Sequence, residues 1–189
     1  MDLILSSFTC PSLTSLTLEG RSISSTPRMF HSLETFLTRS SCALTSLSIY
    51  GLQPTGDALI VIAKQLPSLT SLTIDDLAHS YHCTITPAFI QSLHNTFCLS
   101  STPLLPKLHY LSLRYAGWDF DDAGFVGMIQ SRCLSESDAR RIGIEPLQSL
   151  VLKSYARTPT SFGEVAEIYE PLRRLKEAGF RLIVEGVLE

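Results

Sequence analysis

Charge is scarce in this chain, and its two signs nearly cancel. Only 17% of the 189 residues are charged, the formal net charge at pH 7 is −3, and the pI is about 5.9. Domains that bind nucleic acid need a basic face to neutralise phosphates, so we expect no nucleic-acid partner. Disorder requires high charge with low hydropathy, whereas 44% of these residues are hydrophobic. The sequence therefore predicts a folded chain, large enough at 20.9 kDa for one domain with its own core.

The chain also lacks long apolar runs and regularly spaced cysteines. No apolar stretch approaches the ~20 residues of a membrane span, and the N-terminus has neither the basic region nor the apolar length of a signal peptide. The five cysteines are scattered, odd in number, and form no CxxC pair. Free structural thiols in a reducing compartment are the simplest interpretation. We therefore expect no membrane partner and a cytoplasmic or nuclear location.

Motifs for nucleophilic or phosphate chemistry are missing as well. The sequence contains no GxSxG, no glycine-rich phosphate loop and no HExxH. We therefore expect a protein that is not an enzyme and holds no cofactor. A Ser–His–Asp triad assembled from distant positions stays open at this stage, because serine is abundant and such triads follow no fixed spacing.

Leucine and serine, by contrast, are abundant, with 30 and 25 residues. Five segments match the template LxxLx(L/I), and their first leucines are Leu13, Leu44, Leu69, Leu108 and Leu147. Three of the five share the core Leu-Thr-Ser-Leu-(Thr/Ser)-(Leu/Ile). One match means little in a leucine-rich chain, but five that span its whole length indicate an internal repeat. Successive matches begin 25 to 39 residues apart, so the repeat is irregular and carries insertions.

Helical patterns lie between these segments. Apolar residues recur at helical spacing over 27–40, 55–66, 86–97, 121–129 and 163–178. Thr55 and Thr86 are suitable N-caps, Pro87 suits a first helical turn, and Gly179 suits a stop. Residues 180–184 resemble a sixth, degenerate strand. Strand and helix therefore alternate along the chain, which predicts an α/β fold.

The template also predicts which side chains are buried. We expect parallel strands at 15–19, 46–50, 71–75, 110–114 and 149–153. Side chains alternate along a strand, so the last two leucines of each template face the core. The central leucines should stack as one buried column, formed by Leu16, Leu47, Leu72, Leu111 and Leu150. Since one strand–helix unit cannot cover its own apolar face, neighbouring units must share a continuous core.

These features resemble leucine-rich-repeat solenoids of the ribonuclease-inhibitor-like type. The Pro-x-Leu-x-x-Leu-x-(Leu/Ile) strands with Ser/Thr-rich linkers are most similar to the repeat region of fungal F-box proteins. The resemblance implies about five to six irregular repeats, with strands on a concave face and helices on a convex face. It also implies substrate recognition for a ubiquitin ligase. No F-box precedes the repeats here, so we expect no docking to the adaptor that F-boxes bind.

The resemblance further implies one leucine-rich-repeat domain over residues 1–189, as the C-terminal part of a longer array. Residues 1–9 lead into Cys10 as the end of a repeat helix leads into Cys42. A terminal repeat needs a polar cap, yet Leu3, Ile4 and Phe8 are apolar. We therefore expect this end, Leu5 included, to be partly uncovered and to self-associate. Cys10 and Cys42 should lie mostly buried near the strand entrances.

The outward strand positions differ between the two ends of the array. The first three strands carry serine and threonine until their last outward positions, which hold Glu19, Tyr50 and Asp75. The next two end in Arg114 and Lys153, beside the aromatic residues Tyr110, Tyr115, Trp118 and Tyr155. Arginine and aromatic side chains dominate interface hot spots, although strand propensity alone also favours Thr and Tyr. We expect a protein partner on the concave face, bound by Tyr50, Asp75, Tyr110, Arg114, Trp118, Lys153 and Tyr155.

Arg114 and Lys153 should be neighbours across two parallel strands. Adjacent like charges are unfavourable, which favours an acidic group of a partner between them. The alternative is that each cation pairs with a local carboxylate such as Asp75 or Asp119.

A second functional hypothesis uses histidine and cysteine. A metal-binding or catalytic protein on the same scaffold would draw on His79, His82, Cys83, His94 and Cys98, the last two at helical i, i+4 spacing. These residue types ligate zinc, but their spacing matches no familiar zinc motif. Surface histidines and buried structural cysteines are the simpler interpretation.

Overall fold

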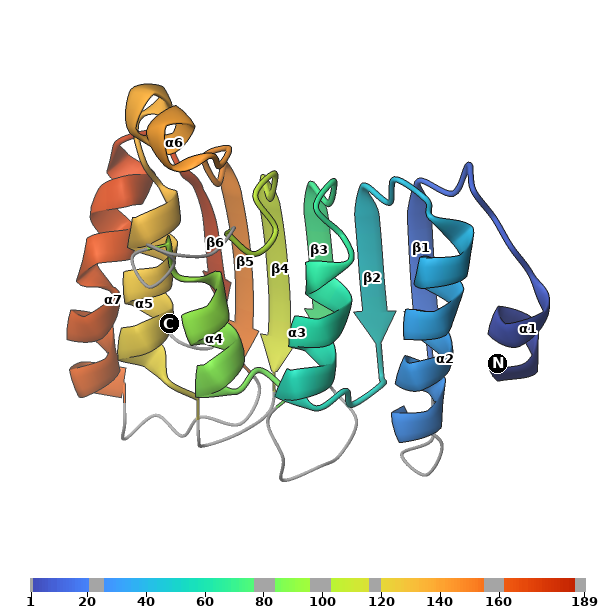
Figure 1. Ribbon diagram of the computed structural model, residues 1–189. Coiled ribbons are helices and arrows are strands. Elements are labelled where there is room, and N and C mark those ends of the chain that lie inside the picture. Colours follow the sequence, from blue (N-terminus) through green and yellow to red (C-terminus); the bar gives the residue numbers. More distant parts are fainter. Residues whose placement is uncertain are drawn as a thin grey trace.

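A computed structural model describes residues 2–20, 26–76, 84–95, 103–115, 120–154 and 162–185 of the chain. Strands and helices alternate through most of this part (Figure 1). The strands are β1 (Ser15–Glu19), β2 (Ser46–Tyr50), β3 (Ser71–Asp75), β4 (Tyr110–Tyr115), β5 (Ser149–Ser154) and β6 (Arg181–Glu185). The helices are α1 (Asp2–Ser7), α2 (Thr26–Ser40), α3 (Gly56–Lys64), α4 (Pro87–Leu93), α5 (Asp122–Arg132), α6 (Glu136–Ile142) and α7 (Phe162–Glu177).

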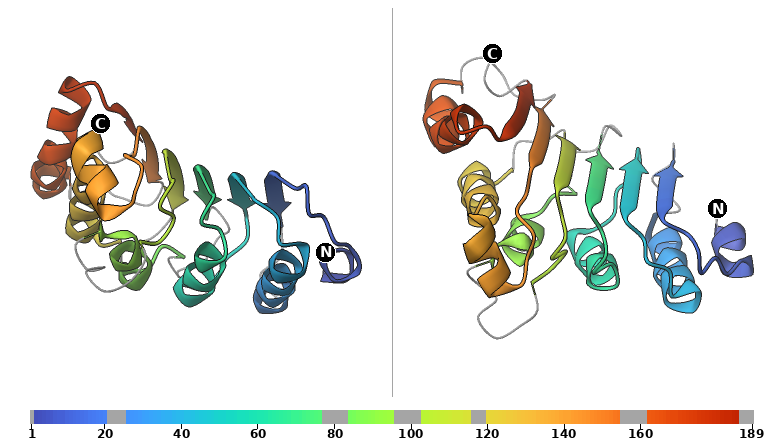
Figure 2. Two further views of the ribbon diagram at one scale, coloured as in Figure 1. Left: turned by 45° about the horizontal axis from the view of Figure 1, so that its top comes forward. Right: turned by 90° about the horizontal axis from the view of Figure 1, so that it is seen from above.

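The six strands form one parallel sheet in sequence order, which confirms the α/β prediction. The helices of the described part lie on one face of this sheet, and no described element covers the opposite face (Figure 2). We call that opposite face the open face. All five predicted template strands are present, and β4 and β5 each extend one residue further than expected.

The register aligns the central leucines in one column, as predicted. Leu47, Leu72, Leu111 and Leu150 are at most 3% exposed, and β6 adds Leu182 to the column. Leu16 is only half-buried, because β1 is the edge strand and has a neighbour on one side alone. Apolar burial of this kind contributes about 25 cal/mol per Å², so the shared leucine column is the main reason that the units stack.

Side-chain caps begin helices α3, α4 and α5. The Thr55 hydroxyl accepts a hydrogen bond from the Ala58 N–H at 3.2 Å, and the Thr86 hydroxyl accepts from the Phe89 N–H at 3.3 Å. The carboxylate of Asp121 caps α5 in the same way. One predicted helix end was wrong, and one helix was not predicted. Helix α4 ends at Leu93 rather than near residue 97, and α6 was not expected.

Helix α6 nevertheless has a capping residue at each end. The Ser135 hydroxyl accepts from the Asp138 N–H, and Gly143 ends the helix in the left-handed region at φ 77°. The segment was overlooked because its sequence, Glu-Ser-Asp-Ala-Arg-Arg-Ile, shows little apolar periodicity. Its charged residues pair along the helix surface instead, as in the Arg140–Glu136 contact at 2.8 Å.

The threonine of the Leu-Thr-Ser-Leu core links one unit to the next. The Oγ1 hydroxyl of Thr45 donates to the carbonyl of Thr14 at 3.0 Å, and the hydroxyl of Thr70 donates to the carbonyl of Thr45 at 3.0 Å. Each of these two carbonyls also accepts two backbone N–H groups from the following strand. We call this arrangement the threonine ladder. It explains why the repeat places a β-branched hydroxyl residue just before these strands.

A buried arginine holds the C-terminal half together. Arg132 is 1% exposed, and its guanidinium donates to three backbone carbonyls, those of Leu93, Leu104 and Leu105. The Nε bond to Leu93 is 2.7 Å long. A buried charge is tolerated only when its donors are satisfied. These bonds tie the end of α4 and the 104–105 turn to α5.

The N-terminal helix is tied down by a surface arginine. Arg39 donates to the carbonyls of Leu5 and Phe8 at 2.7 and 2.5 Å and to the hydroxyl of Thr9 at 3.2 Å. Leu5 belongs to the hydrophobic core and is buried, contrary to our expectation, whereas Phe8 remains 58% exposed as expected. The side chains of Leu3 and Ile4 lie outside the described part.

Candidate protein-interaction face

The open face presents the outward side chains of the strands in three aligned rows. The first row consists of Ser15, Ser46, Ser71, Tyr110, Ser149 and Arg181. The middle row consists of Thr17, Ser48, Thr73, Ser112, Val151 and Ile183. The last row consists of Glu19, Tyr50, Asp75, Arg114 and Lys153. Parallel in-register pairing places equivalent positions of neighbouring strands about 4.8 Å apart.

A hollow of about 240 Å³ opens in the middle of this face. It spans β2 to β5, and its lining consists of Tyr50, Thr73, Ile74, Asp75, Tyr110, Ser112, Arg114 and Lys153. Five of the seven residues that we expected to bind a partner therefore surround one hollow: Tyr50, Asp75, Tyr110, Arg114 and Lys153. Trp118 and Tyr155, the other two, lie outside the described residues.

An ion pair crosses the floor of the hollow. Nη1 of Arg114 lies 3.0 Å from Oδ2 of Asp75, and the carboxylate side chain is only 15% exposed. This is the local pairing that the sequence left open as an alternative. The other sequence expectation also holds, because Arg114 and Lys153 are direct neighbours in the register. The hollow is thus lined by two cations and one carboxylate, and the carboxylate sits on the β3 side of Arg114.

Two neighbouring carboxyl groups have opposite environments at the end of β3. Asp75 faces the hollow, whereas Asp76 is 2% exposed and accepts the Thr84 N–H at 2.9 Å. Burial raises the pKa of Asp76, while hydrogen bonds from Thr84 and Gln53 oppose the rise. Its second oxygen, Oδ1, accepts no hydrogen bond in the described structure. Asp76 therefore belongs to the interior and contributes nothing to the open face.

Tyr115 also faces inward. The sequence grouped it with the aromatic residues beside Arg114 and Lys153, but the side chain is fully buried and its ring stacks on Phe120 at 4.1 Å. The reason is the alternation of side chains along β4, since Arg114 points outward and its neighbour cannot. Of the tyrosines on the described strands, Tyr50 and Tyr110 line the hollow.

The histidine and cysteine cluster falls mostly outside the described part. This applies to His79, His82, Cys83 and Cys98. His94 follows the end of α4, so it does not lie on the helix that was expected to align it with Cys98. Burial lowers the pKa of His94, and the nearby charge of Arg132 lowers it further. Among the described residues, no group of three or more metal-ligating side chains comes together.

The described thiols show structural character. Cys10, Cys42 and Cys133 are free, and Cys10 and Cys42 are half-buried rather than mostly buried as expected. Burial raises the pKa of the Cys133 thiol to about 12. A thiol with so high a pKa holds almost no thiolate at neutral pH and is a poor nucleophile.

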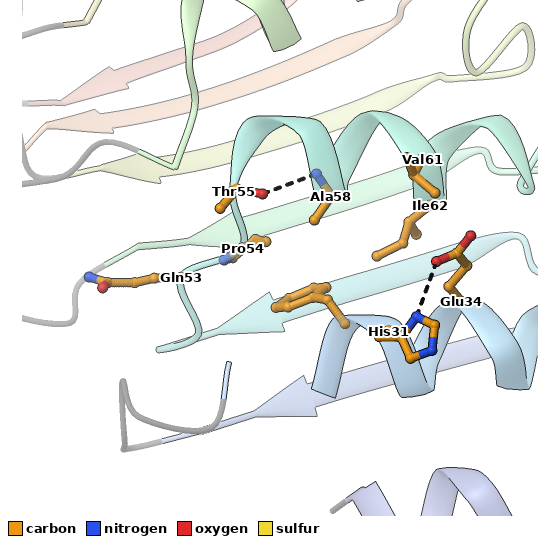
Figure 3. Close-up of a pocket in the computed structure, with 9 residues that line it drawn as sticks. His31, Glu34, Gln53, Pro54, Thr55, Ala58, Val61 and Ile62 are labelled. Atoms are coloured by element: carbon orange, nitrogen blue, oxygen red, sulfur yellow. Dashed lines mark hydrogen bonds and ion pairs between the residues drawn. The ribbon is translucent and has the colours of Figure 1, made fainter. Parts of the chain in front are cut away.

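A second hollow, of about 230 Å³, lies on the helical side between α2 and α3 (Figure 3). Phe30 and Ile62 are buried in its floor, Val61 is 40% exposed at its edge, and Nδ1 of His31 lies 3.8 Å from a Glu34 carboxylate oxygen. Sequence reasoning missed this hollow, because its lining comes from two repeats. It offers apolar surface but few converging polar groups, so it defines no specific chemistry.

Comparison with known proteins assigns neither a family nor a function to the chain. No protein-family model, no curated protein and no solved structure matches the chain. No helix in the described ranges is long and apolar enough to cross a membrane.

Proposed function

We propose that this chain is a non-enzymatic protein–protein interaction module that binds its partner on the open face. The observation that carries the proposal is the convergence of five residues, chosen from sequence alone, around one hollow on that face. Two of them are tyrosines and one is an arginine, the residue types that dominate interface hot spots. The hollow is lined by both polar and apolar side chains, as ordinary interface cores are.

The architecture within this proposal is a leucine-rich-repeat solenoid of the ribonuclease-inhibitor-like type. Its support is the agreement between five sequence templates and five in-register parallel strands, with the helices on the other face. The open face would then be the concave face of the solenoid. Folds of this kind use such a surface for binding.

The cellular role follows from the resemblance to the repeat region of fungal F-box proteins. We place the chain in the cytoplasm or nucleus, as a substrate-recognition region of a ubiquitin ligase. This step rests on analogy of fold and motif, and the face-binding proposal does not depend on it.

The test is an alanine scan of the hollow against a partner captured by proximity labelling in cells. Tyr110→Ala and Arg114→Ala should each weaken binding by about 2 kcal/mol or more. Ser46→Ala, on β2 two strands from β4, and Ser71→Ala, on the adjacent strand β3, serve as controls on the same face and should change it by less than about 0.5 kcal/mol. If the controls have the larger effect, the binding site lies at the other end of the sheet.

The metal-dependent alternative has its own direct measurement. Elemental analysis of protein purified without chelator would show about one zinc per chain if the histidine and cysteine residues form a site. His82→Ala should then remove the metal. A metal-free protein that still binds its partner would contradict the alternative and leave the interaction module as the working function.

A further inference from the structure

The last three strands give the open face an apolar patch beside a cationic one. Val151 and Ile183 are aligned in the middle row, and Ile183 is 51% exposed. Arg114 and Lys153 are aligned in the last row. Val151 and Lys153 are two residues apart on β5, so both patches meet on this one strand. Adjoining apolar side chains with a charged rim are typical of interaction sites, whereas a single exposed apolar residue is not.

The spacing of these two patches matches an extended peptide. Residues two apart in a parallel strand are separated by about 6.6 Å, and alternate side chains of an extended ligand have the same separation. A peptide that lies along β5 can therefore hold one side chain over Lys153 and a second over Val151 and Ile183. A peptide that crossed the strands would meet equivalent positions every ~4.8 Å, which does not fit that repeat.

We propose that the open face binds an extended segment of a partner protein in which an acidic residue stands two positions from an aliphatic residue. The inference rests on the proposed function and specifies the chemistry of the partner. The carboxylate of the segment lies between Arg114 and Lys153, where the hollow gives it room. The aliphatic side chain covers Val151 and Ile183. Charge selects the register of the segment, and burial of the exposed Ile183 adds affinity.

Asp75 acts as an internal competitor in this arrangement. Its Oδ2 accepts a hydrogen bond from Arg114 Nη1 at 3.0 Å, which is the interaction that an incoming carboxylate would make. Asp75 also repels the ligand, because both carry negative charge. Asp75→Asn keeps the shape of the side chain and removes its charge, so it should tighten binding of an acidic segment.

The experiment is selection of a random twelve-residue peptide library on the immobilised full chain. We expect enriched peptides to carry Asp or Glu two positions from Leu, Ile or Val. Lys153→Glu and Ile183→Ser should each weaken a selected peptide by about tenfold or more, and Asp75→Asn should tighten it by about threefold. Ser46→Ala should leave the affinity unchanged. The same peptide with its acidic and aliphatic residues moved to three positions apart should bind about tenfold more weakly. Thermal unfolding confirms that each variant is folded.

The results separate this inference from the proposed function. If Lys153→Glu weakens the binding of selected peptides, but these peptides share no acidic–aliphatic spacing, the inference is wrong and the open face remains the binding site. If Asp75→Asn weakens binding, Asp75 contacts the ligand favourably and the charge assignment is wrong. If no peptide binds, or if Lys153→Glu and Ile183→Ser have no effect on those that do, both the inference and the proposed function are contradicted.

Discussion

On the open face of the sheet, strands β1 to β3 carry side chains of different chemistry from those of strands β4 to β6. At the first two outward positions, β1 to β3 carry only serine and threonine, whereas β4 to β6 carry Tyr110, Val151, Ile183 and Arg181 among them. The last row changes from Glu19 and Asp75 to cations at the boundary between the halves. The leucine column behind both halves is nearly the same. The core therefore does not require the difference, and the larger side chains of the second half are the ones on which the proposed binding role depends.

The two halves are also held together by different polar contacts. Hydroxyls of the threonine ladder link β1, β2 and β3 near the surface, while Arg132 joins three carbonyls in the interior of the second half. Removal of a buried, hydrogen-bonded charge strongly lowers the free energy of unfolding. Removal of a single neutral hydrogen bond lowers it by only about 1 kcal/mol. The second half should thus be the more sensitive to single substitutions.

The largest expected effect is at this buried arginine. Arg132→Met should lower the free energy of unfolding by about 3 kcal/mol, because it leaves three buried carbonyls without their donor. Arg39→Met is the control in the first half. It removes a comparable set of bonds from an exposed arginine and should lower the free energy by less than about 1 kcal/mol. Urea unfolding of both variants measures the two values. Equal losses would show that burial of Arg132 adds nothing.

The threonine ladder should have a smaller effect in the first half. Thr70→Val keeps the shape of the side chain and removes the hydroxyl that donates to the Thr45 carbonyl, so we expect a loss of about 1 kcal/mol. Thr73→Val makes the same atomic change on the open face of β3, the strand that follows Thr70, and should change stability by less than about 0.5 kcal/mol. Denaturant titrations of the pair compare them directly. If Thr73→Val is the more destabilising, the ladder is not what links the units.

The smallest effect concerns pH at the boundary between the halves. Burial raises the pKa of Asp76 above its ordinary value of 3.8, so the folded state binds this proton more tightly than the unfolded state. The stability that Asp76 contributes is present below pH 3.8 and is lost as pH rises through its folded pKa. Asp76→Asn cannot titrate, yet its carbonyl can still accept the Thr84 N–H. Its net effect on stability at neutral pH should be within about 1 kcal/mol.

Urea unfolding of both proteins between pH 4 and pH 7 tests this sign. The variant should gain stability relative to the natural chain as pH rises. If the free energies of unfolding of the two proteins change in parallel with pH, the hydrogen bonds from Thr84 and Gln53 cancel the effect of burial on the pKa of Asp76.

The repeat made the strands predictable and the loops and caps less so. Each template strand was found because Leu16, Leu47 and their equivalents recur with the alternation that a half-buried strand requires. The end of α4 at Leu93 was missed, because the apolar periodicity of the sequence continues to Phe97. Arg132 was missed for another reason, since nothing local marks it. Its three acceptors lie 27 to 39 residues earlier in the sequence.

Sequence alone was sufficient to identify the strand positions, the leucine column and five residues of the candidate site, because equivalent positions of a parallel repeat must become neighbours in register. Only the tertiary structure decided how those neighbours interact. It paired Arg114 with Asp75, turned Tyr115 and Asp76 into the interior, and placed Val151 beside Ile183 of the degenerate strand. These outcomes depend on which face each side chain takes and on the distances between charged atoms across strands, and a one-dimensional pattern does not contain those distances.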